Sequence, residues 1–268
     1  MREFIAIITG DEILNCSVKD ENGFWLCSEL NSLGFFTKEI VYIRDNLENI
    51  SSHIKRALSM NIDVIIITGG LGPTYDDKTL RAVSIALGKD LKLNEEALKM
   101  VKMRYDSLYN KGIIKDKELN KNREKMAILP DGSIPIRNNT GAAPGVMLKI
   151  GNTLIFALPG VPSEMKSMFN EEIKKILIDE FGQWTYLEKN IFLDHRDEST
   201  ITETLEKISR DHGIYVKSRS GILNGERKMV ITLALRSEDQ NVANERMNMA
   251  LNELLEYLKN KNINYLIQ

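Results

Sequence analysis

The stretch 62–81 constrains the fold most strongly, because it reads as a buried strand, a glycine-rich turn and the start of a helix in direct succession. The run Ile62–Ile67 is apolar and mostly β-branched apart from Asp63, which is typical of a strand buried on both faces of a parallel sheet. Three glycines follow at once, namely Gly69, Gly70 and Gly72. Glycine adopts positive φ without steric cost and lets another molecule approach the main chain closely. Ligands of α/β proteins bind at this kind of junction, at the carboxyl edge of the sheet.

The loop that follows the strand predicts a site for a metal-bridged phosphate. Consecutive backbone N–H groups and a helix N-terminus attract anions, and we expect Thr74 or Thr79 to cap a helix that stops at Gly88. Asp76 and Asp77 would repel a bare phosphate, whereas Mg²⁺ is usually held by one or two carboxylates together with phosphate oxygens. The alternative is that the glycines only make a turn and the aspartates only cap the helix.

Composition excludes several classes of protein. The 268 residues suffice for one large domain, or for a medium domain with a smaller companion. A net charge of −2 gives no global field that would recruit nucleic acid or an anionic membrane. The N-terminal apolar run is too short for a secretory signal, and we expect no membrane span. Cys16 and Cys27 are the only cysteines, which fits a cytoplasmic protein without disulfides.

The N-terminal half alternates strands and helices, which predicts a doubly wound or three-layer α/β domain. Phe4–Ile8 is another buried apolar run, and Gly10, Asp11 and Glu12 follow it. If this strand and Ile62–Ile67 are parallel neighbours, the carboxylates after both strands emerge at one edge of the sheet. Apolar spacing and turn signals predict the other elements, which are a helix introduced by Asp20 and Asn22, a strand Phe35–Ile43 and a helix Leu47–Met60.

Two later loops also have the composition of a ligand site. Asn138–Gly145 is small and polar, and the pattern Val146–Leu158 around Gly151-Asn152 predicts a β-hairpin. The hairpin leads into Pro159–Glu164, where we expect Ser163 to cap a helix. The charged stretch Lys111–Lys125 mixes both signs and predicts a solvated helix face rather than a nucleic-acid patch.

From about Leu187 the pattern changes to strand, helix, two strands and a long helix, which predicts a small α+β module of the ferredoxin-like or KH-like type. We therefore place a domain boundary near residues 181–186, with a nucleotide- or phosphate-binding domain at 1–182 and the small α+β domain at 183–268.

Five motifs occur in an order that resembles the MoaB/Mog molybdopterin-binding-like domain family, and within it the N-terminal part of the competence-damage-inducible CinA proteins. They are T-G-D-E-I-L (9–14), D-E-N (20–22), G-G-L-G-P-T-Y-D-D-K-T (69–79), N-N-T-G-A-A-P-G (138–145) and L-P-G-V-P-S-E-M (158–165). The resemblance covers about residues 1–180, and Cys16 stands where the family usually has glycine. The smaller module is similar to the linker domain of CinA proteins.

The resemblance implies a three-layer αβα fold and a metal-dependent hydrolase that cleaves ADP-ribose to AMP and ribose 5-phosphate. The cofactor would be a divalent metal, Mg, Mn or Co. It also implies a small-molecule nucleotide substrate and a homo-oligomer, a dimer or trimer. We do not expect the nicotinamide mononucleotide deamidase domain that many CinA proteins carry. Two alternatives remain open, namely binding or adenylylation of molybdopterin and a nucleotide-binding module without catalysis.

The predicted site has a metal end, a phosphate end and a nucleoside end. We expect Asp76 and Asp77 to hold the metal, with Glu12 or Asp20 as a further ligand, and Asp20 or Asp77 to orient the attacking water. Lys78 would stabilise the leaving phosphate as a point charge. Asn139, Thr140 and Gly141 would shape the nucleoside end. The other phosphate and nucleotide contacts are expected from Gly10, Asn22, Gly69, Gly70, Leu71, Gly72, Thr74, Pro159, Gly160 and Pro162.

Overall fold

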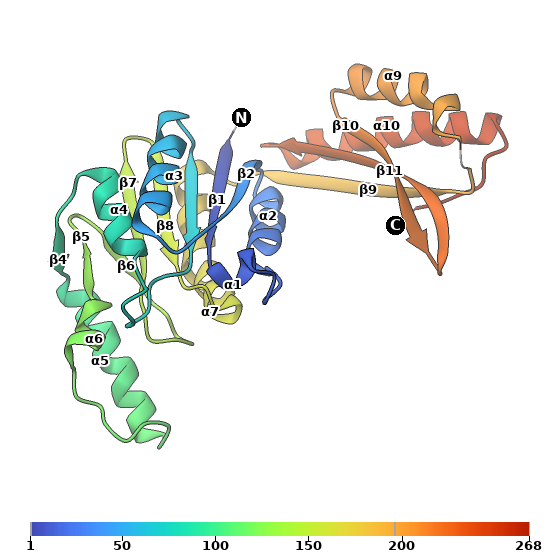
Figure 1. Cartoon of the computed structure of the whole chain (residues 1–268). Helices are drawn as coiled ribbons and strands as arrows, with labels where there is room; N and C mark the ends of the chain where they lie inside the picture. The colour runs from blue at the N-terminus through green and yellow to red at the C-terminus, as the bar shows by residue number, and fades with distance from the viewer. Residues whose placement is uncertain (1, 196, 268) are drawn as a thin grey trace. The chain divides into compact units, whose positions relative to one another are not determined.

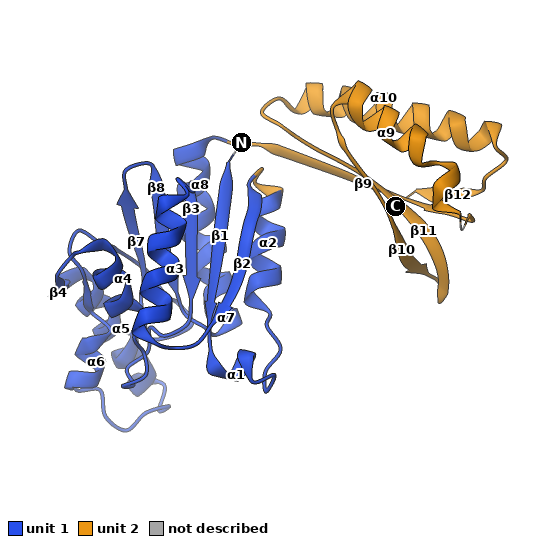
Figure 2. Ribbon diagram, turned by 45° about the horizontal axis from the view of Figure 1, so that its top comes forward, with its two compact units in different colours: residues 1–31, 35–182 blue, residues 32–34, 183–268 orange. Residues whose placement is uncertain are grey.

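The computed structural model describes residues 2–195 and 197–267, and the chain divides into two compact units (Figures 1 and 2). The first unit holds the residues up to Gly182 except Ser32–Gly34, and the second holds Ser32–Gly34 and the residues from Gln183 onward. Each unit has its own sheet and is described by itself. Among the described residues, no helix is both long and apolar enough to cross a membrane.

The first unit is built on a six-stranded mixed sheet in the order β2-β1-β3-β8-β7-β6. Its strands are β1 (Glu3–Thr9), β2 (Phe36–Ile43), β3 (Val64–Thr68), β6 (Ile134–Ile136), β7 (Gly145–Ile150) and β8 (Thr153–Leu158). The four strands β2, β1, β3 and β8 are parallel, whereas β7 and β6 run antiparallel to their neighbours. The antiparallel pair β7–β8 confirms the hairpin predicted around Gly151.

Helices cover both faces of this sheet, as the three-layer prediction requires. The helices of the first unit are α1 (Asp11–Leu14), α2 (Asn22–Ser32), α3 (Leu47–Ser59), α4 (Thr79–Leu87), α5 (Glu95–Asn110), α6 (Lys121–Lys125), α7 (Pro162–Met168) and α8 (Lys174–Phe181), with a π-helical turn Phe169–Ile173 between the last two. Of these, α1 and α6 bury no residue. Ile50 of α3 and Val83 of α4 share one core cluster with Ile7 and Ile67 of the sheet. Helix α2 lies on the opposite face (Figure 2). Its Trp25 packs edge to face on Phe169 of the π-helical turn, with ring centroids 5.2 Å apart.

Local signals set several helix boundaries correctly, and two predicted caps are wrong. Gly88 ends α4 in the left-handed region with φ of +63°, as expected. Neither Thr74 nor Thr79 caps α4, because the N-cap residue is Lys78 and its side chain makes no capping bond. Thr79 instead lies inside the helix, and its hydroxyl donates a hydrogen bond of 2.8 Å to the Gly69 carbonyl.

The start of α7 differs from the prediction, and Cys16 has an unusual backbone conformation. Ser163 is not the cap of α7, because the chain already enters the helix at Pro162 and the N-cap is Val161. Proline suits the first helical turn, so it displaces the expected serine start. Cys16 has a positive φ of 58°, a conformation that glycine adopts more readily.

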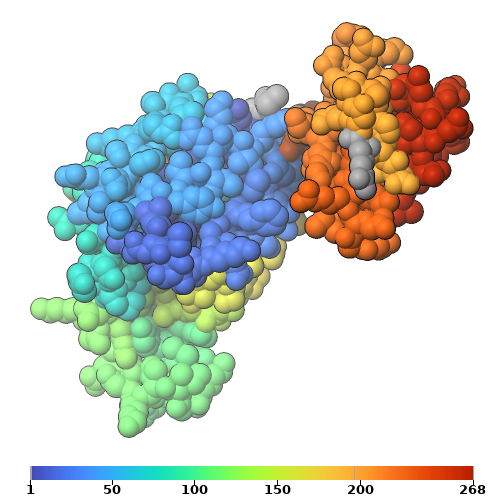
Figure 3. All heavy atoms as spheres, turned by 45° about the vertical axis from the view of Figure 1, so that its right-hand side comes forward, coloured from blue at the N-terminus to red at the C-terminus, as the bar shows by residue number. Residues whose placement is uncertain are grey.

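The charged stretch 111–125 is only partly helical, in contrast to the predicted solvated helix. A helix forms at α6 alone, and a loop connects it to α5. The segment stands out from the rest of the first unit and then returns to β5 (Ile128–Pro130), which pairs with β4 (Leu91–Leu93) in a separate two-stranded sheet (Figures 1 and 3).

The second unit is a four-stranded antiparallel sheet in the order β10-β11-β9-β12, with two α-helices. Its elements are β9 (Thr185–Leu193), α9 (Thr202–His212), β10 (Tyr215–Leu223), β11 (Glu226–Ser237), α10 (Gln240–Asn260) and β12 (Tyr265–Ile267), besides a 3₁₀ turn Glu198–Thr200. This βαββαβ order is ferredoxin-like rather than KH-like, and β12 is the element that the sequence did not reveal. Apolar residues of the helices and strands form one core, as Ile231 and Leu254 illustrate.

Candidate functional site

The carboxyl edge of the parallel strands brings three loops of the first unit together. β1 and β3 are parallel neighbours with Ile8 opposite Thr68, which confirms that the loops after both strands leave the same edge. The loop after β8 lies against the glycine loop so closely that a Cβ on Gly160 would be 3.3 Å from the Gly69 Cα. Asn22 is buried to 4% exposure and donates a hydrogen bond of 2.8 Å to the Gly160 carbonyl. Close approach of main chains therefore explains why glycine occurs in both loops.

Two cavities open on either side of the glycine loop and share it as a common wall. The larger has a volume of about 740 Å³ and the smaller about 490 Å³, within the range of small-molecule sites. Both are lined by the loop residues Gly70–Pro73 and by Asp77. The sequence predicted this loop as the centre of the site, but it did not reveal that the loop separates two cavities.

Carboxylates gather in the smaller cavity. Its wall includes three of the predicted metal ligands together with two carboxylates that the sequence did not single out, namely Glu12, Asp76, Asp77, Asp45 and Glu164. Over the ranges 2–195 and 197–267, these and the other candidate side chains do not form a group of three that could enclose a metal ion by themselves. One or two protein carboxylates are nevertheless the usual number for a metal that also binds phosphate oxygens.

Hydrogen bonds fix the two aspartates of the loop. The Asp77 carboxylate accepts from the Thr74 amide at 2.8 Å and from the Thr74 hydroxyl at 2.6 Å. The Thr74 hydroxyl is also placed to donate to Asp76, and this hydrogen bond is the main cause that lowers the pKa of Asp76 below its ordinary value. The Asp76 carboxylate therefore stays ionised down to lower pH than a free aspartate.

The glycine loop presents main-chain N–H groups, but not all of those predicted to bind phosphate. The Gly69 amide donates to Leu158 in the sheet ladder at 2.9 Å, and the Gly10 amide donates to Ile43 at 3.2 Å. These two amides are thus already engaged. Within the described part of the chain, no group accepts a hydrogen bond from the amides of the loop residues between Gly69 and Pro73, which are Gly70, Leu71 and Gly72. These three N–H groups are therefore unengaged, and their residues line both cavities.

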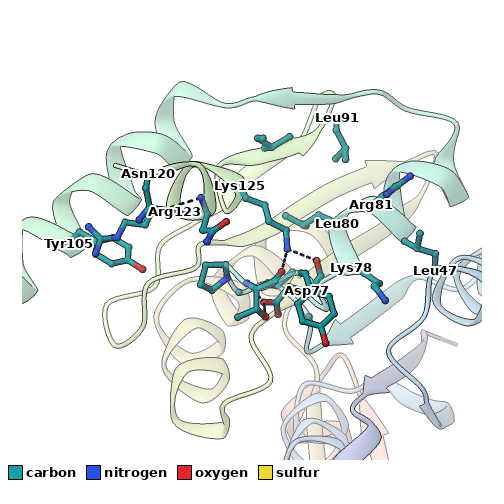
Figure 4. Close-up of a pocket in the computed structure, with 18 residues that line it drawn as sticks. Leu47, Asp77, Lys78, Leu80, Arg81, Leu91, Tyr105, Asn120, Arg123 and Lys125 are labelled. Carbon is teal, nitrogen blue, oxygen red and sulfur yellow. Dashed lines mark hydrogen bonds between the residues drawn. The ribbon is translucent and has the colours of Figure 1, made fainter. Parts of the chain in front are cut away.

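The larger cavity is lined by cations and apolar side chains (Figure 4). Its cations are Lys78, Arg81, Arg123 and Lys125. Lys125 of α6 donates to the carbonyl of Asp77 at 2.8 Å and also to the Thr74 carbonyl, so it holds both ends of the loop that carries the aspartates.

Sequence reasoning missed the contribution of the segment 120–125 to this cavity. Arg123 lies over the Tyr105 ring, 4.0 Å from its centroid, and donates to the Glu118 carbonyl at 2.7 Å. A local signal for the start of α6 was present, because Asn120 is a favourable capping residue and accepts from the Asn122 and Arg123 amides. Nothing local indicated that the segment returns to the glycine loop.

Several predicted site residues have structural partners instead of a place in either cavity. Asp20 caps α2, where its carboxylate accepts from the Asn22 and Gly23 amides at 3.0 Å, and it also accepts from the Tyr42 hydroxyl at 3.0 Å. Pro162 starts α7 and, among the described residues, belongs to neither lining.

The loop 138–145 enters the smaller cavity through residues other than those predicted. Asn139 binds Glu171 at 2.5 Å, whereas Ala142 and Ala143 line the cavity. The loop is shaped by the buried Asn138, which accepts from the Gly141 amide at 2.7 Å and donates to Glu164 at 2.7 Å. Other predicted residues do line a cavity: Gly69, Pro159 and Gly160 the smaller, and Thr74 and Lys78 the larger.

Comparisons with known proteins agree with this architecture. Residues 5–179 match the model of a family described as a probable molybdopterin binding domain. A Pyrococcus furiosus protein is 40% identical over 80% of this chain and 84% of its own length. A Sulfurisphaera tokodaii protein is 38% identical over 92% of this chain and 91% of its own length.

A solved structure extends the comparison. The protein CinA from Thermoplasma acidophilum, whose function is unknown, superposes with a TM-score of 0.59 and 31% identity. The superposition covers 65% of this chain and 98% of that protein. The matched family model, the identities and the superposed fold lead to one conclusion: the chain belongs to the probable molybdopterin binding domain family, of the MoaB/Mog-like fold, and is CinA-like.

Proposed function

We propose that the chain binds a nucleotide pyrophosphate and hydrolyses its phosphoanhydride bond with the help of a divalent metal, with ADP-ribose as the first candidate substrate. The observation that carries the proposal is the row of unengaged amides from Gly70 to Gly72 between an acidic and a basic cavity. Phosphates bind such rows of N–H groups. A dinucleotide-like ligand with its phosphates on this wall would extend one end into each cavity.

The carboxylates of the smaller cavity fit a metal that is shared with the substrate. Asp77 and Asp76 would hold it, with Glu12 on the same wall. When bound, a divalent metal neutralises charge on the phosphate oxygens as the bond breaks. The residues support this fit because Asp77 is held in one orientation by Thr74.

The chain's own groups would bind the pyrophosphate, orient the attacking water and neutralise the leaving phosphate. The three loop amides would orient the pyrophosphate, and Asp77 would accept a hydrogen bond from the attacking water. Lys78 lines the larger cavity beside Asp77 and would neutralise the phosphate that leaves on that side. We give Asp20 no role in this scheme, because its carboxylate accepts hydrogen bonds from the first amides of α2.

The test is product release from a panel of ADP-ribose, NAD, FAD and ATP, each with Mg²⁺, Mn²⁺ or Co²⁺ and each with chelator. We expect AMP from ADP-ribose only when metal is present, read by chromatography. Silence across the panel, from protein whose far-UV circular dichroism shows that it is folded, would overturn the hydrolase proposal.

A second candidate is binding of a pterin phosphate, favoured by the matched family, whose model describes a probable molybdopterin binding domain over residues 5–179. The phosphate would use the same loop amides. Titration calorimetry with molybdopterin separates the candidates, because binding of the pterin without hydrolysis of any panel compound would favour the second. Tight nucleotide binding without turnover would point to a non-catalytic binding module.

A further inference from the structure

The proposed chemistry uses one cation of the larger cavity, Lys78, and the cavity holds more positive charge than that. Four cations line it, and the one carboxylate among its lining residues is Asp77 on the shared wall. A ligand that leaves the wall in this direction therefore enters a basic environment. Cations in a partly enclosed cavity attract anionic groups more strongly than the same cations in open water.

Two of the four cations already have structural roles. Lys125 holds the carbonyls of Thr74 and Asp77, and Arg123 stacks on Tyr105. Their donors and ring contacts fix the loop and the outer wall. These two side chains are therefore at least partly engaged in holding the protein's own groups.

The other two cations have unused donors. The side chains of Lys78 and Arg81 make no hydrogen bond or ion pair with any group in the described ranges of the chain. Lys78 is the N-cap residue of α4 and Arg81 lies in the first turn. Residues three apart on a helix have Cβ atoms about 5–6 Å apart, so two long side chains can converge on one anion.

Figure 4 shows where this pair lies relative to the loop. Lys78 is next to Asp77, and Arg81 lies farther along α4, toward Leu47. Both residues line the larger cavity, into which a ligand would extend from the shared wall. A guanidinium group and an ammonium group together suit a phosphate ligand, which has three oxygens and up to two charges, better than they suit a carboxylate ligand.

We infer that Lys78 and Arg81 form a second anion subsite, which selects ligands whose nucleoside end carries a further phosphate on the ribose. The inference rests on the proposed function, because it takes the nucleoside to lie in the larger cavity. It adds the substrate class: nucleotides with a ribose phosphate beyond the 5′-phosphate.

The test compares AMP with adenosine 2′,5′-bisphosphate and adenosine 3′,5′-bisphosphate by titration calorimetry at one fixed, low ionic strength. None of these probes has an anhydride bond, so turnover does not interfere. We expect one bisphosphate to bind about tenfold more tightly than AMP, the size of effect that a charge-assisted hydrogen bond gives. The two bisphosphates distinguish the position of the phosphate.

The variants Arg81→Met and Lys78→Met should each bring this ratio of affinities toward one, and Lys55→Met, which removes a charge from the exposed surface of α3, should leave it unchanged. Circular dichroism checks that each variant is folded. A ratio near one in the unmodified protein, or a ratio that survives in the Arg81→Met and Lys78→Met double variant, would overturn the subsite.

The two proposals fail separately. If the protein hydrolyses ADP-ribose but binds the bisphosphates no more tightly than AMP, the subsite is wrong and the hydrolase proposal stands. A large ratio that depends on Arg81, in protein that hydrolyses no panel compound, removes the hydrolase and leaves the subsite.

Discussion

The amino group of Lys125 donates a hydrogen bond of 2.8 Å to the carbonyl oxygen of Asp77, and so joins α6 to the loop of the candidate site. The same group donates to the Thr74 carbonyl, so one side chain spans the turn that carries Asp76 and Asp77. A segment far along the chain thus fixes the conformation of the carboxylates.

Lys125→Met should loosen this turn. Hydrogen bonds from a charged donor contribute about 1.5–3 kcal/mol in favourable settings, and we expect a stability loss near the lower end because Lys125 is half-buried. Hydrogen exchange of residues 74–77 should speed up, and the metal concentration for half-maximal turnover should rise. Lys121→Met, an exposed change on the same helix, is the control, and equal exchange in both variants would contradict the role of Lys125.

Asp77→Asn should abolish metal-dependent turnover and preserve the fold. The amide keeps an oxygen that can accept from Thr74, but it lacks the charge that attracts a divalent ion. We expect turnover to fall by at least about 100-fold, which corresponds to about 2.7 kcal/mol of transition-state stabilisation. Steady-state kinetics measures the change, with Asp179→Asn on the exposed surface of α8 as control. An unaffected rate would remove Asp77 from the metal site.

Gly69→Ala should destabilise the first unit far more than Gly88→Ala. Gly69 has φ of +104°, and a Cβ there would lie 2.5 Å from the Thr9 hydroxyl oxygen and 2.6 Å from the Thr9 carbonyl oxygen. Gly88 has φ of +63°, and a Cβ added there would meet no atom within 4 Å. We expect a loss of about 3 kcal/mol or more at Gly69 and about 1 kcal/mol at Gly88. Urea unfolding measures both, and similar losses would contradict the crowded loop.

The second unit should lose stability at acidic pH through Glu253. Hydrogen bonds from Lys207, first, and from His212 lower the pKa of Glu253 below its ordinary value of 4.5. Because the folded state holds the charged form, this contribution is present above pH 4.5 and disappears as the pH falls through the lowered pKa.

Glu253→Gln provides the measurement for this contribution. The difference in melting temperature between the unmodified protein and the variant should be largest near neutral pH and should shrink as the pH is lowered to about 3. A difference that stays constant over this range would show that ionisation of Glu253 does not stabilise the fold.

Elements with strong local signals were predictable from the sequence. The apolar run after Ile62 predicted a buried strand, and the helices on both faces of the sheet explain why both faces of this strand are apolar. Gly88 predicted a helix end, and Gly151-Asn152 predicted the hairpin turn. In these cases the residue type and the local backbone conformation decide the structure together, so neighbours in the sequence carry the information.

Features that depend on distant segments were not predictable. Thr79 gave a capping signal, yet its hydroxyl binds the Gly69 carbonyl across the folded loop. Asp20 is of a residue type that binds metal ions, but its position two residues before Asn22 makes it a helix cap. Lys125 belonged to a mixed-charge run, and only the return of that run to the glycine loop gives its amino group two carbonyl partners.

The wall shared by the two cavities links what binds on one side to what binds on the other. Gly70–Pro73 and Asp77 form part of both, and Lys125 and Thr74 hold this wall in one arrangement. If a ligand on either side displaces the wall, each ligand changes the affinity for the other by the same factor, whichever binds first. Any cooperativity between metal and nucleotide would then depend on these five residues. Positive cooperativity would mean that both ligands favour the same position of the loop, and negative cooperativity that they favour different positions.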